Sequence, residues 1–167
     1  MKKWFGFALS ILILMSIVGC GEKLTEEQLR AKAMDYENKE QWDQVVKVYE
    51  ELLKRFPDSE KTDVSLYLLG GLYASNFKDF DKSIEAYNRL IEKCPQSDLV
   101  VRAHFMIGYR YANDLKDLDK AREAYSKFLQ KYPDHELSAS VKWELDHLGQ
   151  DISDIELQFG SGESAQK

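Results

Sequence analysis

A repeat of fixed period is the feature that most constrains how this chain folds. Three segments align without gaps and begin at equal intervals: Tyr49–Pro57 (YEELLKRFP), Tyr87–Pro95 (YNRLIEKCP) and Tyr125–Pro133 (YSKFLQKYP). A unit of this size cannot bury its apolar face alone, so neighbouring units must stack to form a continuous core. The period therefore predicts a repeat protein.

Each repeat contains two helical patterns with a turn between them. Leu66, Leu69 and Tyr73 follow three- and four-residue spacing, which predicts one helix. After a polar turn at 76–79 the apolar spacing restarts, and the second helix is expected to end before Pro95. Gly70 lies inside the first pattern, where a missing side chain lets helices approach closely. The chain is predicted to be all-α.

These positions resemble the tetratricopeptide repeat. The second and third repeats supply its aromatic, small and proline positions as Leu69-Gly70, Tyr73, Phe80, Ser83, Tyr87, Leu90 and Pro95, and as Ile107-Gly108, Tyr111, Leu118, Ala121, Tyr125, Phe128 and Pro133. The first repeat lacks the Leu-Gly pair, and the period is about four residues longer than is usual in the family. The resemblance implies a right-handed α-α solenoid of three helix pairs within residues 26–149.

The longer period and the repeat ends Phe-Pro-Asp-Ser, Cys-Pro-Gln-Ser and Tyr-Pro-Asp-His narrow the resemblance. They are similar to the bacterial envelope subset, which includes the lipoprotein of the β-barrel assembly machinery and the repeat domain of the Tol–Pal accessory protein. The first is longer, and the second carries a coiled coil that has no counterpart here. The resemblance therefore implies the class of envelope repeat proteins, but not the individual role of either of these two proteins.

A last helix is expected at 137–148, with Val141, Leu145 and Leu148 on one stripe. A solenoid exposes the apolar flank of its final repeat, so a helix that covers it is expected there. Residues 150–167 are interpreted as an extension, with a disordered tail from Gly160.

Residues 1–19 are interpreted as a lipoprotein signal peptide. Lys2 and Lys3 precede an apolar stretch that is too short to span a membrane as a helix. Its end, Ile17-Val18-Gly19-Cys20, resembles the bacterial lipobox, which implies cleavage before Cys20 and acylation, including palmitate, at that residue. Acyl chains would hold the protein at a membrane through a tether at 20–25. Gly21 follows Cys20 where an inner-membrane retention signal often has Asp, which favours the periplasmic side of the outer membrane, or the cell surface in an organism without one.

Composition and spacing exclude several kinds of function. The net charge of -6 opposes non-specific binding to nucleic acid, because nothing offsets repulsion from phosphates. The three histidines show no metal-ligand spacing, so neither a metal nor another cofactor is expected. No catalytic residues are predicted, and the protein is not expected to be an enzyme. Cys94 fits a half-buried apolar filler, with an intermolecular disulfide as the alternative.

In tetratricopeptide arrays the first helices of successive repeats line a concave face that binds partners. The resemblance places the following candidates on that face: Arg30, Met34, Tyr67, Arg102, Phe105, Tyr109, Asn113 and Trp143. Tyr67, Phe105 and Trp143 are one repeat period apart from each other and are expected to form an aromatic ladder. Such residues dominate binding energy at interfaces, but aromatic side chains at this position also seal adjacent helices.

The leading hypothesis is a membrane-anchored scaffold that binds envelope proteins or peptides, with outer-membrane assembly or maintenance as the expected process. One alternative is a structural envelope protein that self-associates through a repeat face. Another is a glycan-binding accessory module of a cell-wall enzyme, in which the aromatic ladder stacks on sugar rings.

Overall fold

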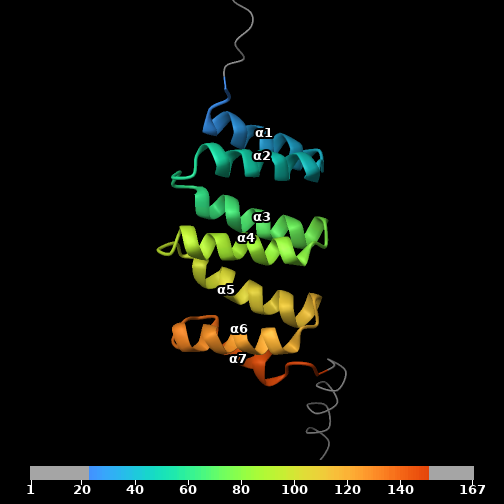
Figure 1. Cartoon of the computed structure of the whole chain (residues 1–167), viewed down its shortest axis with the longest axis vertical. Helices are drawn as coiled ribbons and strands as arrows, with labels where there is room; N and C mark the ends of the chain where they lie inside the picture. Colours follow the sequence, from blue (N-terminus) through green and yellow to red (C-terminus); the bar gives the residue numbers. More distant parts are fainter. Residues whose placement is uncertain (1–22, 151–167) are drawn as a thin grey trace, which may run out of the picture.

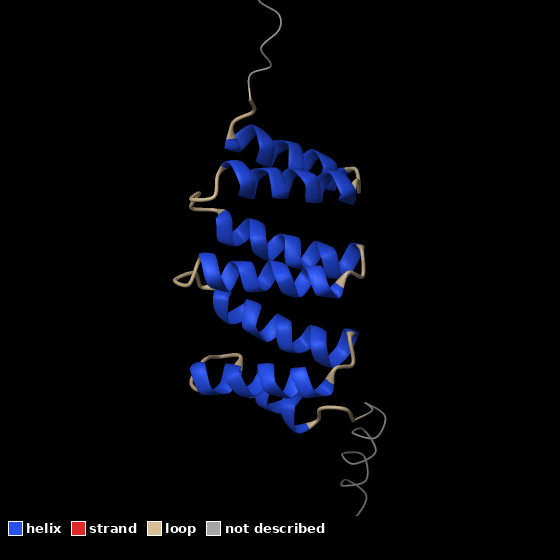
Figure 2. Cartoon of the chain, in the orientation of Figure 1, coloured by secondary structure: helices blue, strands red, loops and turns tan. Residues whose placement is uncertain are grey.

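The computed structural model describes residues 23–150, and within that range every regular element is helical (Figure 2). The elements are α1 (Glu26–Asn38), α2 (Trp42–Arg55), α3 (Thr62–Asn76), α4 (Phe80–Lys93), α5 (Leu99–Tyr109), the π-helical turn η1 (Arg110–Asp114), α6 (Leu118–Lys131) and α7 (Ser138–Asp146). The all-α prediction is confirmed. The predicted signal peptide, Cys20 and the extension beyond residue 150 lie outside the described residues.

The helices stack as successive antiparallel pairs along one axis (Figure 1). The turns inside the pairs α1–α2, α3–α4 and α5–α6 lie on one side of the stack, and the loops between pairs lie on the other. This is the arrangement of a tetratricopeptide-like solenoid, as the repeat predicts. Its right-handed superhelical sense stays a prediction.

The turns inside the three pairs share one backbone feature. The equivalent residues Glu40, Lys78 and Lys116 of the three repeats all adopt left-handed backbone, with φ of 53°, 55° and 56°. Two positions after each of them, α2, α4 or α6 begins. In the second turn the backbone N–H of Asp79 donates to the carbonyl of Tyr73 over 2.9 Å, which closes the loop at the end of α3.

Close approach of the paired helices explains the helical glycines. A Cβ added to Gly70 would lie 2.5 Å from the Tyr87 ring, and one added to Gly108 would lie 2.5 Å from the Tyr125 ring. The Ser83 hydroxyl also donates to the Gly70 carbonyl over 2.7 Å. The large ring of the second helix therefore fills the space that the glycine of the first helix leaves.

The core runs as three contiguous apolar clusters from α1 to α7. At its end Val141 of α7 is fully buried, while Leu145 and Leu148 are half-buried against the same cluster. The last helix thus covers the final repeat as expected, but it is shorter than residues 137–148. Gly149 follows it in left-handed backbone, with φ of 84°.

Candidate protein-binding surfaces

The eight candidates predicted from the resemblance all lie on α1, α3, α5, η1 or α7, and we call this set the first-helix face. Its members are Arg30 and Met34 on α1, Tyr67 on α3, Arg102, Phe105 and Tyr109 on α5, Asn113 in η1 and Trp143 on α7. The structure gives these side chains different degrees of exposure. Their role in binding stays a prediction.

Arg30 is half-buried and joins the first repeat to the second. Its guanidinium bonds Oε1 of Glu26 from both Nε and Nη2, at 2.9 and 2.8 Å. Its Nη1 donates to the hydroxyl of Ser65 on α3 over 3.1 Å. Nothing in the predicted core requires an arginine at this position. The contacts within the chain explain its presence without a binding partner.

Met34 and Arg102 are freely accessible. Met34 is 62% exposed, and Arg102 is exposed at the start of α5. Two further apolar side chains on α3, Val64 and Leu68, are 42% and 40% exposed and were not predicted. They lie four positions apart on one helical face and outside the core stripe. An apolar pair with this spacing is the sequence pattern from which their exposure could have been predicted.

The aromatic ladder is graded from half-buried to exposed. The Tyr67 ring packs on Tyr87, with centroids 5.5 Å apart, and the Phe105 ring packs on Tyr125, with centroids 6.4 Å apart. These two rings partly seal the paired helices. Trp143 is 48% exposed and stacks on His147 with centroids 4.5 Å apart and an interplanar angle of 22°.

The end of α5 and the turn η1 carry a polar cluster beside the ladder. The Arg110 guanidinium lies 5.2 Å from the Tyr109 ring centroid and bonds Oδ2 of Asp114 over 2.6 Å. Asn113 is exposed, and its Nδ2 donates to the Tyr109 carbonyl over 3.4 Å. The Tyr109 ring itself contacts the Arg110 guanidinium and the Phe105 ring, whose centroid lies 6.2 Å away.

Burial causes the main pKa shifts near this face. It raises the pKa of Tyr87 to about 12, with the neighbouring Tyr67 hydroxyl acting in the same direction. Burial also raises the pKa of the Glu144 carboxyl, against a hydrogen bond from Asn113 and the nearby His147. These groups are spread along the stack, and each shift follows from packing. Within residues 23–150, no three His, Cys, Asp or Glu side chains gather so that they could hold a metal ion.

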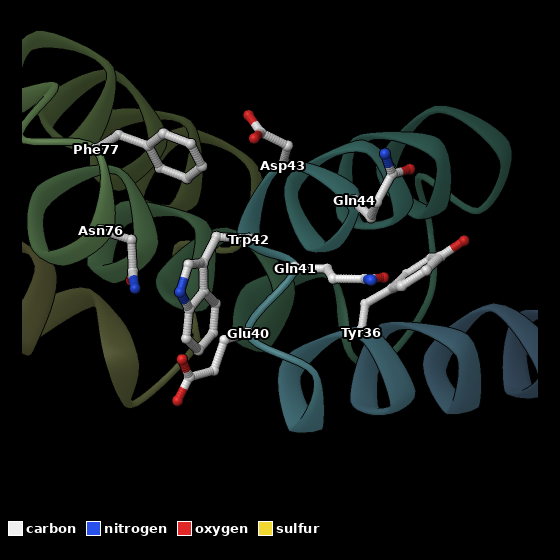
Figure 3. Close-up of a pocket in the computed structure, with 8 residues that line it drawn as sticks. All are labelled: Tyr36, Glu40, Gln41, Trp42, Asp43, Gln44, Asn76 and Phe77. Carbon is white, nitrogen blue, oxygen red and sulfur yellow. The ribbon is translucent and has the colours of Figure 1, made fainter.

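A pocket that the sequence did not predict lies at the turns inside the first two helix pairs (Figure 3). Its volume is about 730 Å³, and it is lined by Tyr36, Glu40, Gln41, Trp42, Asp43, Gln44, Asn76 and Phe77. Trp42 begins α2, and Phe77 follows the end of α3. The lining therefore combines three aromatic rings with two carboxylates.

The comparisons with known proteins agree with the repeat architecture. A family model named YfiO and described as an outer membrane lipoprotein matches residues 22–161. Among curated proteins, none matches the chain. In the described part of the chain, no helix is both long and apolar enough to cross a membrane.

Proposed function

The chain belongs to the YfiO family of outer membrane lipoproteins, and from this premise we propose that it is a lipid-anchored scaffold that binds other envelope proteins. Acyl chains on Cys20 would hold it at the inner leaflet of the outer membrane, with the repeats in the periplasm. The proposed process is assembly or maintenance of that membrane, and the proposed role involves no catalysis.

The observation that carries this proposal is the exposed part of the first-helix face. Trp143 and Met34 offer large apolar surface to solvent, and the Tyr109 ring lies beside the Arg110 guanidinium. Aromatic side chains and arginine are the residues most often found as hot spots of protein interfaces. A stacked array presents them on a rigid frame, since each helix is packed against its neighbours.

The experiment is affinity purification of the protein from membranes under mild detergent. Trp143→Ala is the sharpest variant, because the indole is half exposed and its removal leaves the core intact. Tyr67→Ala and Phe105→Ala test the rest of the ladder, with thermal unfolding to show that each variant is folded. Lys127→Ala, an exposed change on α6, is the matched control.

We expect the ladder variants to lose partner proteins that the control retains. A change to alanine at a hot spot costs about 2 kcal/mol or more, which weakens binding about thirtyfold. Identical partner lists for the control and all three folded variants would remove the first-helix face as the binding surface. Cys20→Ser separately tests the anchor, since it should release the protein from the membrane fraction.

A further inference from the structure

In the second and third pairs, one flank of the first helix packs against the second helix of the same pair. On α5 this flank carries Val101 and Phe105, which contact the apolar cluster that includes Tyr125 of α6. The Phe105 and Tyr125 ring centroids are 6.4 Å apart, and those of Tyr67 and Tyr87 in the second pair are 5.5 Å apart. We call this side of a first helix its pairing flank.

The last helix, α7, has the same flank, but within residues 23–150 no second helix lies beside it (Figure 1). Ala139 and Trp143 stand one repeat period after Val101 and Phe105. Both are exposed, and 48% of the Trp143 surface is open to solvent. The opposite flank, with Val141, is buried against the last repeat. In the described part of the chain, α7 is therefore a first helix whose pairing flank is open.

The chain turns after α7 as it turns inside the pairs. Gly149 has left-handed backbone, with φ of 84°, as Glu40, Lys78 and Lys116 have in the three turns. A Cβ added to Gly149 would lie 2.9 Å from Cδ1 of Leu118, the first residue of α6. Figure 1 shows the described chain ending on the side of the turns inside the pairs, where every second helix begins. The residues that follow therefore start beside the open flank.

The sequence of residues 151–159, which lie outside the described part, repeats the spacing of the second helices. In α4 and α6 an aspartate cap is followed directly by an apolar residue, with buried residues three and seven positions further on. These are Asp79, Phe80, Ser83 and Tyr87 in α4, and Asp117, Leu118, Ala121 and Tyr125 in α6. After α7 the same spacing holds for Asp151, Ile152, Ile155 and Phe159. Apolar residues at this spacing form one face of a helix, and aspartate is a preferred N-cap.

We propose that residues 151–159 dock on the pairing flank of α7 as the second helix of a fourth pair and cover Trp143. This inference rests on the proposed function and adds a regulation to it. A helix of this length is marginal alone in water, so it would depend on its packing against α7. A partner that contacts Trp143 must displace the segment, which lowers the apparent affinity by the fraction of molecules that are uncovered.

Positions along the chain indicate which residues face one another, because facing residues of an antiparallel pair lie about equally far from the turn. Trp143 lies six positions before Gly149, and Ile155 lies six positions after it. Ala139 and Phe159 each lie ten positions from the glycine. A large ring would thus lie over a small side chain, as large rings lie over the helical glycines of the second and third pairs.

The test uses the full acylated chain in detergent micelles, labelled with ¹⁵N-tryptophan. A soluble nitroxide broadens each indole signal according to the exposure of its ring. Ile155→Ser with Phe159→Ser should increase the broadening of Trp143 about twofold or more, because a cover present in at least half of the molecules is removed. Leu157→Ser is the matched control, since it removes an apolar residue of the same segment that lies off the stripe. The Trp42 signal should stay in place in every variant, which shows that the repeats remain folded.

Three results of this measurement would overturn the proposal. The first is equal broadening of Trp143 in the unchanged chain and the double variant, and the second is an equal effect of Leu157→Ser. The third is protection of Trp143 that fades on dilution, which would assign the cover to a second copy of the chain.

Affinity purification from membranes tests the regulation separately. If the segment covers Trp143 in about nine molecules of ten, the double variant should bind about tenfold more tightly those partners that Trp143→Ala loses. Unchanged capture by the double variant would remove the regulatory role. If Trp143→Ala loses no partner, the proposed function fails at this residue, while the nitroxide measurement still decides whether the segment docks.

Discussion

Two adjacent glycines in α3 should respond in opposite ways to the same substitution. Gly70→Ala places a methyl group 2.5 to 2.9 Å from three ring carbons of Tyr87, a side chain that is 1% exposed. Gly71→Ala places the same methyl group where nothing lies within 4 Å apart from the adjacent residues and the helix's own backbone. Both changes raise helix propensity equally, so the pair isolates the cost of the close contact.

The magnitudes follow from the two contributions. Alanine is favoured over glycine inside a helix by about 1 kcal/mol, which is the expected gain at Gly71. At Gly70 the ring of Tyr87 must move within a close-packed core, and overpacking of this kind costs about 1–3 kcal/mol. In the variant, the same displacement would also disturb the hydrogen bond from the Ser83 hydroxyl to the Gly70 carbonyl. Together these contributions give an expected net loss of about 1–2 kcal/mol for Gly70→Ala.

Urea unfolding followed by circular dichroism, together with thermal melts, measures both variants. For a domain of this size, 1 kcal/mol corresponds to about 4 °C in Tm, so the two variants should differ by about 8 °C or more. Gly108→Ala should behave like Gly70→Ala, because its added methyl would meet Tyr125 at 2.5 Å. If Gly70→Ala were as stable as Gly71→Ala, the close approach of the paired helices would be wrong.

Three further outcomes are expected. Glu50→Gln removes the bidentate ion pair with Arg89 between α2 and α4, whose two N–O distances are 2.9 and 3.2 Å. Because both groups are partly exposed, urea titrations should show a loss of unfolding free energy below about 1 kcal/mol, and about 1 M NaCl should remove the difference. Lys78→Gly relieves left-handed backbone and should change the unfolding free energy by about 0 to +1 kcal/mol, whereas Lys78→Val should lower it. Burial raises the pKa of Tyr49 and Tyr87 from 10.0 to about 12. Their stabilising contribution should therefore be full below about pH 10 and lost toward pH 12, as urea titrations at increasing pH would measure. In Tyr49→Phe, the unfolding free energy should fall less steeply over this pH range.

The helix pairs could be predicted because their residues repeat at a fixed period. Tyr87 and Tyr125 identify the second helix of each pair, and the glycines opposite them identify the first. The turn at 76–79 and the start of α4 at Phe80 were read from the point where the apolar spacing breaks. Local spacing and the requirement to bury one apolar stripe are sufficient for that much.

The exposure of the candidate residues could not be predicted in the same way. The position of Arg30 on its helix places it among the residues predicted to contact a partner. In the structure its guanidinium instead bonds Ser65 of the second repeat. Trp143 and Phe105 occupy equivalent positions, yet Phe105 has the Tyr125 ring to pack on, while Trp143 stacks on His147 of its own helix end. These differences in exposure depend on which side chain lies next to each residue in the folded stack. The pattern of a single repeat does not specify those neighbours.

Departures from the repeat are therefore more informative about binding than the repeat itself. Features that recur in every unit, such as the left-handed backbone at Glu40, Lys78 and Lys116, are needed to build each turn. A residue that changes in one unit is free of that need. Gln44 stands where Lys82 and Lys120 reach a tyrosine ring, and in the first repeat Lys32 of α1 lies over the Tyr36 ring instead. Stability alone does not require that change, because Lys82 shows that a lysine fits the turn. A scaffold gains specificity when otherwise equivalent units carry different side chains, and the turn of the first repeat differs in this way from the other two.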